Sequence, residues 1–248
     1  MLPGYGSRVI SDGVAGSANS GVGTPVRAGG LAKALLADVA YERLVAKLRH
    51  GEVRAGEFVS IPTLVRMLAM PLAPVREAVK RAEARSLVSV LPKRGVSIMT
   101  ATAAEIRDCL DLRSILEEEA ARRLIASPLP PPLGGMWNER LRIVEGSLEG
   151  ADSVLTKRVV DVELSLHDFL ATGIENPLAT EVYLVNRDRI SVIQHSRPLP
   201  PARIASVMEE QLAILDALER RDAEGAVHAI HAHNRATMRW WGALLQTA

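Results

Sequence analysis

Apolar residues recur with a helical period along most of the chain, and one short stretch departs from it. In the first 100 residues, apolar side chains spaced i, i+3, i+4 and i+7 predict three helices, around 41–48, 61–68 and 75–82. The segment that follows predicts two strands joined by a tight turn: Val88 and Val90, then Pro92 to Gly95, then Val96 and Ile98. Beyond residue 100, periodic stretches separated by proline-rich breaks predict six more helices, at about 103–126, 137–149, 152–172, 177–196, 201–221 and 223–246.

These elements predict a mainly α protein with two domains. Three helices followed by a basic hairpin are typical of a winged helix-turn-helix domain, which we place at 31–100. The six later helices predict an all-α bundle over 101–248 with room for an internal pocket. Residues 1–30 are rich in Gly and Ser with almost no bulky apolar spacing, so we expect a disordered tail.

Composition and charge narrow the possible environment and partners. The single cysteine, Cys109, excludes an internal disulfide framework and a cysteine-rich zinc site. No apolar run approaches the roughly 20 residues that span a bilayer, and we expect a cytoplasmic protein without a membrane partner. The net charge of +1 comprises +1 for residues 1–30, +6 for 31–100 and −6 for 101–248. The basic segment suits a polyanion, and the acidic one a different partner.

Basic residues on the third helix and in the hairpin predict contacts with double-stranded DNA. A helix-turn-helix places its second helix in the major groove, where Arg76 could bond a guanine edge with its planar fork. Lys80 on the same helix, with Lys93 and Arg94 in the hairpin turn, would contact phosphates or bases. Gly95 would allow the wing backbone to approach DNA closely.

Three stretches resemble the DNA-binding domain of the GntR family of bacterial transcription regulators: AYERLVAKLRHGEVRAGEFVS, PVREAVKRAEARSLV and LPKRGVSI. The helical remainder is similar to the FCD effector domain of that family's FadR branch. The resemblance implies a homodimeric, ligand-responsive regulator that binds a pseudo-palindromic operator. Where the family usually has Ser/Thr-Arg-Thr-Pro, this chain has Pro71-Leu72-Ala73-Pro74, which predicts an unusual operator or relaxed specificity. The alternative is a paralogue with degraded DNA recognition that acts as a ligand- or protein-binding module.

Four polar side chains lie on helix faces that the apolar spacing marks as inward. Glu163 and His167 are four residues apart on one face, as two ligands of one metal require. Gln211 and His233 lie on inward faces of the last two helices. His233 shares its helix face with Ile230, Thr237 and Trp240. His228 and His231 point elsewhere and are expected at the surface.

The family resemblance implies that such side chains hold one divalent metal. It implies an Asp, a His four residues later and two more His on the final helices. Here Glu163, His167 and His233 match three of these positions, and Gln211 replaces the expected third His. Two interpretations stay open: a Zn or Ni ion held by three residues and water, or a metal-free pocket where Gln211 and both His bond the effector directly.

Arg113 is predicted to point into the bundle, because it shares a face with Ile106 and Leu110. A buried guanidinium needs an anionic partner, and a ligand carboxylate suits its bidentate fork. The predicted effector is therefore a small organic acid; the alternatives are an internal salt bridge from Arg113 to Glu163 or Asp161, and a larger acyl-coenzyme ligand. A hydrolase using Glu163, His167 and His233 lacks an evident nucleophile or oxyanion donor, so we predict no enzyme activity.

Overall fold

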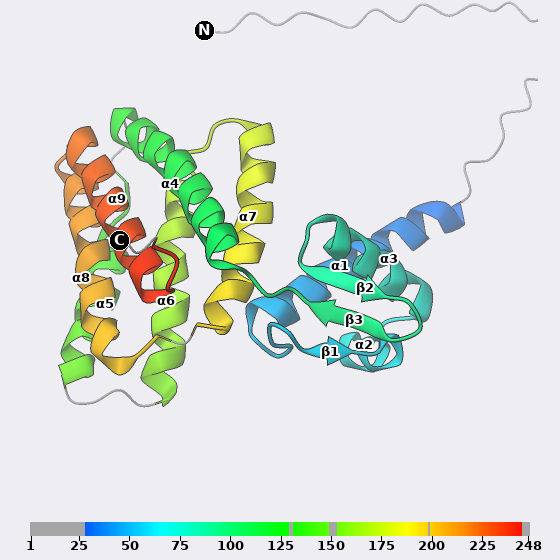
Figure 1. The fold of residues 1–248 in the computed structure, drawn as a ribbon. Coiled ribbons are helices and arrows are strands. Elements are labelled where there is room, and N and C mark those ends of the chain that lie inside the picture. Colours follow the sequence, from blue (N-terminus) through cyan, green and yellow to red (C-terminus); the bar gives the residue numbers. More distant parts are fainter. Residues whose placement is uncertain (1–27, 129–130, 149–152, 198, 245–248) are drawn as a thin grey trace, which may run out of the picture.

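A computed structural model describes residues 28–128, 131–148, 153–197 and 199–244 of the chain. It shows a small domain with a three-stranded sheet beside a larger helical bundle (Figure 1). The small domain comprises α1 (Ala28–Arg49), β1 (Phe58–Val59), α2 (Ile61–Leu68), α3 (Leu72–Ala84), β2 (Val88–Leu91) and β3 (Gly95–Ile98). The bundle comprises α4 (Ala103–Ala126), α5 (Gly134–Leu148), α6 (Ser153–Ala171), α7 (Pro177–His195), α8 (Pro201–Glu219) and α9 (Ala223–Trp240).

The helix-turn-helix forms where the sequence supplies start and stop signals. Ser60 caps α2, since its Oγ accepts a hydrogen bond from the Thr63 N–H at 3.2 Å. Pro62 occupies the first turn of α2, where a missing N–H costs nothing. The helix ends at Ala69, which has a left-handed φ of 48°, and Pro71 precedes α3. The three helices and the hairpin predicted for this domain are confirmed.

The wing is an antiparallel sheet with the strand order β1-β3-β2. Gly95 begins β3 with a φ of 120°, and a Cβ placed there would lie 2.6 Å from the Val59 carbonyl oxygen. Close packing of β1 against β3 therefore requires glycine at this position. The two-residue strand β1 was not predicted from the sequence, because Phe58 and Val59 are too few to show an alternating pattern.

The core of the winged domain uses the predicted helix faces. Tyr41, Leu44 and Leu48 of α1 are buried with Val75 and Val79 of α3. This core also includes one residue of the bundle, Val192 of α7. The disordered tail predicted for 1–30 is wrong at its last three residues, because α1 begins at Ala28 and residues 28–30 form its first turn. Positions 1–27 of the predicted tail lie outside the described residues.

The bundle has a buried polar layer between apolar clusters. Its helices pack as the pairs α4–α9, α8–α9, α5–α8, α6–α8, α5–α6, α4–α6 and α4–α7. Along α6, Val159 and Val162 belong to one apolar cluster and Leu166 and Leu170 to another. Glu163 and His167 lie at the boundary between these clusters and are buried. Polar residues of α4, α8 and α9 join them there: Arg113, Glu117, Gln211 and His233.

The last helix is shorter than predicted. It ends at Trp240 instead of continuing to residue 246, because Gly242 adopts a left-handed φ of 68°. The N–H of Gly242 donates to the Arg239 carbonyl, and that of Ala243 to the Met238 carbonyl, which closes the helix end. Trp240, predicted on the inward stripe, is consequently half exposed. None of the helices described is long and apolar enough to cross a membrane.

Candidate functional site

Three predicted ligands from two helices converge in the polar layer of the bundle. The ligand atoms of Glu163, His167 and His233 all lie within 4.8 Å of one another. Glu163 Oε1 is 3.2 Å from His167 Nε2 and 3.9 Å from His233 Nε2. His233 Nε2 is buried without a hydrogen-bond partner among the described residues. A buried imidazole nitrogen without a partner, aimed at a carboxylate and a second imidazole, is the arrangement that a divalent metal would complete.

Each histidine is oriented by a second carboxylate. His167 Nδ1 lies 2.9 Å from Glu117 Oε1, and His233 Nδ1 lies 2.9 Å from Glu210 Oε2. Because a carboxylate only accepts, both Nδ1 atoms carry the hydrogen. His167 also lies within hydrogen-bonding distance of Glu163 through its Nε2, so a protonated His167 ring donates to both carboxylates when no metal is bound. The His233 ring, whose pKa is lowered, is neutral and directs its Nε2 lone pair toward Glu163, where a cation would fit between them. Such carboxylate–histidine pairs are the usual outer shell of a metal site.

The electrostatics of the cluster keep its carboxylates ionised. Burial alone would raise the pKa of Glu163, but hydrogen bonding and charge from His167, with Arg113 and His233 nearby, lower it to about 2. Burial opposes ionisation of Glu117 too, yet the charge of His167 lowers its pKa. Burial lowers the pKa of His233. Burial and Arg113 also act to lower the pKa of His167, but its carboxylate partners raise it overall. Because its pKa is about 2, the Glu163 carboxylate is ionised at neutral pH, as a metal ligand must be.

Gln211 lies in the layer but points its amide group at other residues. It is fully buried; its Oε1 accepts from Arg140 Nε at 2.8 Å, and its Nε2 donates to the Glu163 carbonyl at 3.0 Å. Arg140 is also fully buried and donates further to the carbonyls of Met136 and Val162. Burial lowers its pKa to about 10. Gln211 therefore positions the α6 backbone at Glu163, and its role in effector binding stays a prediction.

Arg113 is buried as predicted and lies at the cluster. It is 4% exposed and makes no ion pair among the described residues, so the alternative of a salt bridge to Glu163 or Asp161 is not formed. Its charge nevertheless contributes to the lowered pKa values of Glu163 and His233, and it opposes the rise in the pKa of His167 that the carboxylate partners cause. Arg113 thus supplies positive charge beside the site, and its contact with an effector stays a prediction.

A cavity of about 690 Å³ runs from the cluster to the winged domain. Its wall includes Glu163 and Gln194 at the cluster, and Arg49 and His50 from the end of α1. Arg197 also lines it, and its Nη1 donates to the Trp241 carbonyl without any carboxylate partner among the described residues. Apolar side chains of Val159, Val160, Leu164, Leu199, Val207, Trp240 and Trp241 complete much of the wall. Arg113 and Gln211 do not line it.

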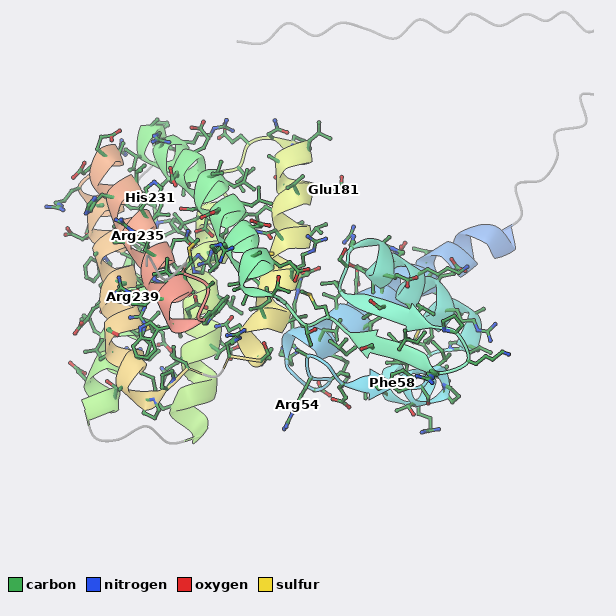
Figure 2. The ribbon with its side chains drawn as sticks, in the orientation of Figure 1. Arg54, Phe58, Glu181, His231, Arg235 and Arg239 are labelled. Carbon is green, nitrogen blue, oxygen red and sulfur yellow. The ribbon has the colours of Figure 1, made fainter. Side chains whose placement is uncertain are left out.

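Four of the five predicted DNA-binding residues are exposed on the winged domain, and Gly95 is partly buried. Arg76, Lys93 and Arg94 are exposed, and none makes an ion pair among the described residues. Lys80 is exposed and pairs with Glu77 at 3.0 Å on its own helix. Lys93 holds a left-handed φ of 63° in the hairpin turn. Phe58 is also exposed beside the wing strands (Figure 2).

The other basic residues of α3 face α1 instead. The Arg81 guanidinium lies 4.5 Å from the centre of the Tyr41 ring and pairs with Asp38. Arg85 donates to the Tyr41 hydroxyl at 2.9 Å. At the start of α3, Leu72 is 47% exposed where the family motif has an arginine. The reading face of α3 is therefore less charged than its composition indicates.

Several residues of the site were not identified from the sequence. Glu117, Glu210, Arg140 and Gln194 were missed, although Glu117 follows Arg113 by four residues on the same inward face. The surface assignment of two histidines is confirmed: His228 is exposed, and His231 lies with Arg235 and Arg239 along the outer face of α9 (Figure 2). His231 pairs there with Glu118 at 3.1 Å.

A winged helix-turn-helix joined to a helical bundle with a buried ligand cluster defines a class of ligand-responsive DNA-binding regulators. Residues 36–98 match the bacterial regulatory proteins of the gntR family, and residues 108–236 match the FCD domain. The chain belongs to the GntR family and carries an FCD effector domain, which makes it a transcriptional regulator and not an enzyme.

Similar proteins agree with this assignment. The chain is 21% identical over 198 residues to YdhC of Bacillus subtilis, an uncharacterised HTH-type transcriptional regulator, covering 78% of this chain and 85% of that protein. The structure of E. coli McbR/YncC superposes with a TM-score of 0.71 at 19% identity, covering 84% of this chain and 97% of that one. A GntR regulator from Rhodococcus sp. RHA1 superposes with a TM-score of 0.68 at 18% identity, over 87% of this chain and all of that one. These superpositions confirm the fold.

Proposed function

We propose that this protein is a homodimeric repressor or activator that senses a small organic acid at a metal-containing site in the bundle and responds by changing its affinity for an operator. The observation that carries the proposal is the buried cluster of Glu163, His167 and His233, of which Glu163 lines a cavity that reaches the DNA-binding domain. A ligand in this cavity would contact both domains and would bind two arrangements of them with different affinity.

The site would hold one divalent ion, Zn²⁺ or Ni²⁺, through Glu163 Oε1 and the Nε2 atoms of His167 and His233. The unpartnered Nε2 of His233 favours this over the metal-free pocket. When bound, the ion would supply positive charge and open coordination positions for a carboxylate. The protein's own contribution is to hold the histidine rings through Glu117 and Glu210 and to add the charge of Arg113.

The effector is proposed to be an organic acid with an apolar body. Among the described residues, Arg197 is the guanidinium of the cavity wall without a carboxylate partner, and Val160, Leu164 and Trp241 offer apolar surface. A cavity of about 690 Å³ lies within the range of pockets for small organic ligands. Arg113 and Gln211 would act without lining the cavity. Arg113 would add positive charge beside the cluster, and Gln211 would position the backbone at Glu163.

A second copy of the chain would use an apolar surface on the bundle. Ile115 of α4 and Leu178 and Val182 of α7 are exposed, on two helices that pack against each other. These three side chains would be covered on association of two copies, since a stable dimer buries exposed apolar groups. A two-fold dimer would present two recognition helices to a pseudo-palindromic operator. Light scattering on Ile115→Arg tests this: we expect a monomer, and an unchanged dimer contradicts the assignment.

DNA recognition is proposed to use Arg76, Lys80, Lys93 and Arg94, with Gly95 shaping the wing. Because Leu72 cannot donate to a base, the operator should differ from that of relatives that carry an arginine there. Selection of binding sites from a random duplex pool at physiological salt tests the proposal. A recovered palindrome supports a specific dimeric regulator, while sequence-independent, salt-sensitive binding contradicts it and supports the paralogue with degraded recognition.

A further inference from the structure

The last turn of α7 contacts the metal-ligand cluster and the winged domain through consecutive residues. Gln194 Nε2 donates to Glu163 Oε2 at 2.9 Å, on the oxygen that does not face the histidines. The next residue, His195, donates from Nε2 to the carbonyl of Arg49 at the end of α1. One turn of helix therefore links a carboxylate of the cluster to the backbone of the DNA-binding domain.

The contact between His195 and α1 is closely fitted. Gly51 follows α1 with a left-handed φ of 66°, and a Cβ there would lie 2.8 Å from His195 Nδ1. Only glycine allows both this backbone conformation and the close approach of the imidazole. A small change in the position of His195 would thus be felt directly by the turn that ends α1.

Two more residues of α7, one and two helical turns before His195, contact the winged domain. Arg49 Nε donates to Asp188 Oδ1 at 2.8 Å, and Asp188 is almost fully buried. Val192 belongs to the core of the winged domain. Because α7 takes part in that core, a shift of its last turn would displace α1 as well.

The cavity places its occupant against the same elements. Glu163, Gln194 and His195 line it from the bundle, and Arg49 and His50 line it from α1. A divalent ion held by Glu163 Oε1 would act on a carboxylate whose other oxygen accepts a hydrogen bond from Gln194. The carboxylate cannot move without stretching or releasing that hydrogen bond.

We propose that the last turn of α7 couples the metal site to DNA binding, with Gln194 as the positioning residue on Glu163 and His195 as the positioning residue on α1. This inference rests on the proposed function and specifies how it is regulated. Metal binding at the cluster changes the hydrogen bond between Gln194 and Glu163, and His195 passes this change on to the position of the winged domain. At this end of the cavity the divalent cation would act beside the organic acid that is proposed as the effector.

The test measures DNA affinity with and without Zn²⁺, and Zn²⁺ affinity by competition with a chromophoric chelator, on the full chain and its selected duplex. For the wild type we expect Zn²⁺ to change the DNA Kd by about 5–150-fold. His195→Ala should keep its Zn²⁺ affinity within about threefold but lose most of this change. His195→Gln, which retains a donor, should keep part of it. Gln194→Ala should weaken Zn²⁺ binding by about 10–100-fold.

Controls separate the inference from the function on which it rests. His228→Ala changes an exposed histidine of α9 and should behave as the wild type. Glu163→Gln should abolish the response to Zn²⁺ altogether. A His195→Ala protein that keeps the full response overturns the coupling alone, as does a wild type that binds both Zn²⁺ and DNA without any response. A wild type that binds neither Zn²⁺ nor specific DNA contradicts the proposed function itself.

Discussion

Polar residues of the winged domain and those of the bundle are organised in opposite ways. In the winged domain, Arg76, Lys93 and Arg94 are exposed, and none of them makes an ion pair among the described residues. In the bundle, Glu163 and His167 are buried in a network that extends to Glu117, Glu210, Gln211, Arg140 and Tyr183. The exposed basic side chains of the winged domain are free to contact a large ligand such as DNA. The buried side chains of the bundle are held by one another around a single small site.

This difference predicts how substitutions combine. Exposed side chains that contact separate phosphates or bases should give small effects that add. Buried side chains that share partners should give large effects that do not add, because removing one leaves the others without a partner.

Glu163→Gln should give the largest change. It removes the anionic ligand on which both histidines converge, with little change of shape, and metal affinity should fall by more than about 100-fold. Competition with a chromophoric chelator measures the loss. Glu209→Gln, an exposed carboxylate on α8, is the matched control. Equal metal affinity in the two variants would exclude the cluster as a metal site.

Glu117→Gln should weaken metal binding by about 10–100-fold without touching a ligand atom. The carboxylate holds the Nδ1–H of His167 and accepts from Tyr183 at 2.9 Å, so its loss releases the imidazole ring. In the double variant with His167→Ala, the effect of Glu117→Gln should vanish. Fully additive losses in the chelator titration would show that the network is not coupled.

Arg76→Ala should reduce discrimination at one operator position by about 1–3 kcal/mol. The residue is exposed on the reading face of α3 and has no partner to lose within the described residues. Anisotropy titrations on the selected duplex and its single-base variants measure the change. Arg123→Ala, on the surface of the bundle, should leave the preference intact. If Arg76→Ala does so as well, Arg76 does not read bases.

Lys93→Ala and Arg94→Ala should have the smallest effects and should add. Each removes one phosphate contact of the wing, so the slope of log K against log salt should fall by about one per substitution, with little change in sequence preference. Titrations at several salt concentrations measure the slope. An unchanged slope in the double variant would place the wing away from the DNA.

The sequence predicted the architecture well, because helical spacing and helix-ending residues act locally. The faces of α1 and α3 and the ends marked by Pro71, Pro177 and Pro201 all appear in the structure. The sequence did not predict two local features correctly. The end of α9 depends on the backbone conformation of Gly242, and β1 is too short to carry a pattern.

The candidate site was predictable only in part. Inward-facing polar residues on α6 and α9 gave the three ligands, since buried polar groups interrupt an apolar stripe visibly. Their partners were not predictable: Glu117 and Glu210 lie on other helices, and their distances to the histidines depend on how those helices pack. The cavity between α1 and the bundle likewise depends on how the two domains pack against each other. The spacing of apolar residues along the chain carries no information about that packing.

The central claim is that the buried cluster is a metal site within a DNA-binding regulator. The most direct measurement is the metal content, by atomic absorption, of protein purified without a chelator or a nickel resin, with Glu163→Gln prepared in parallel. We predict about one Zn or Ni ion per chain in the wild type and a large loss in the variant. A wild-type content near zero, unchanged after incubation with Zn²⁺ and removal of the excess, would contradict the claim.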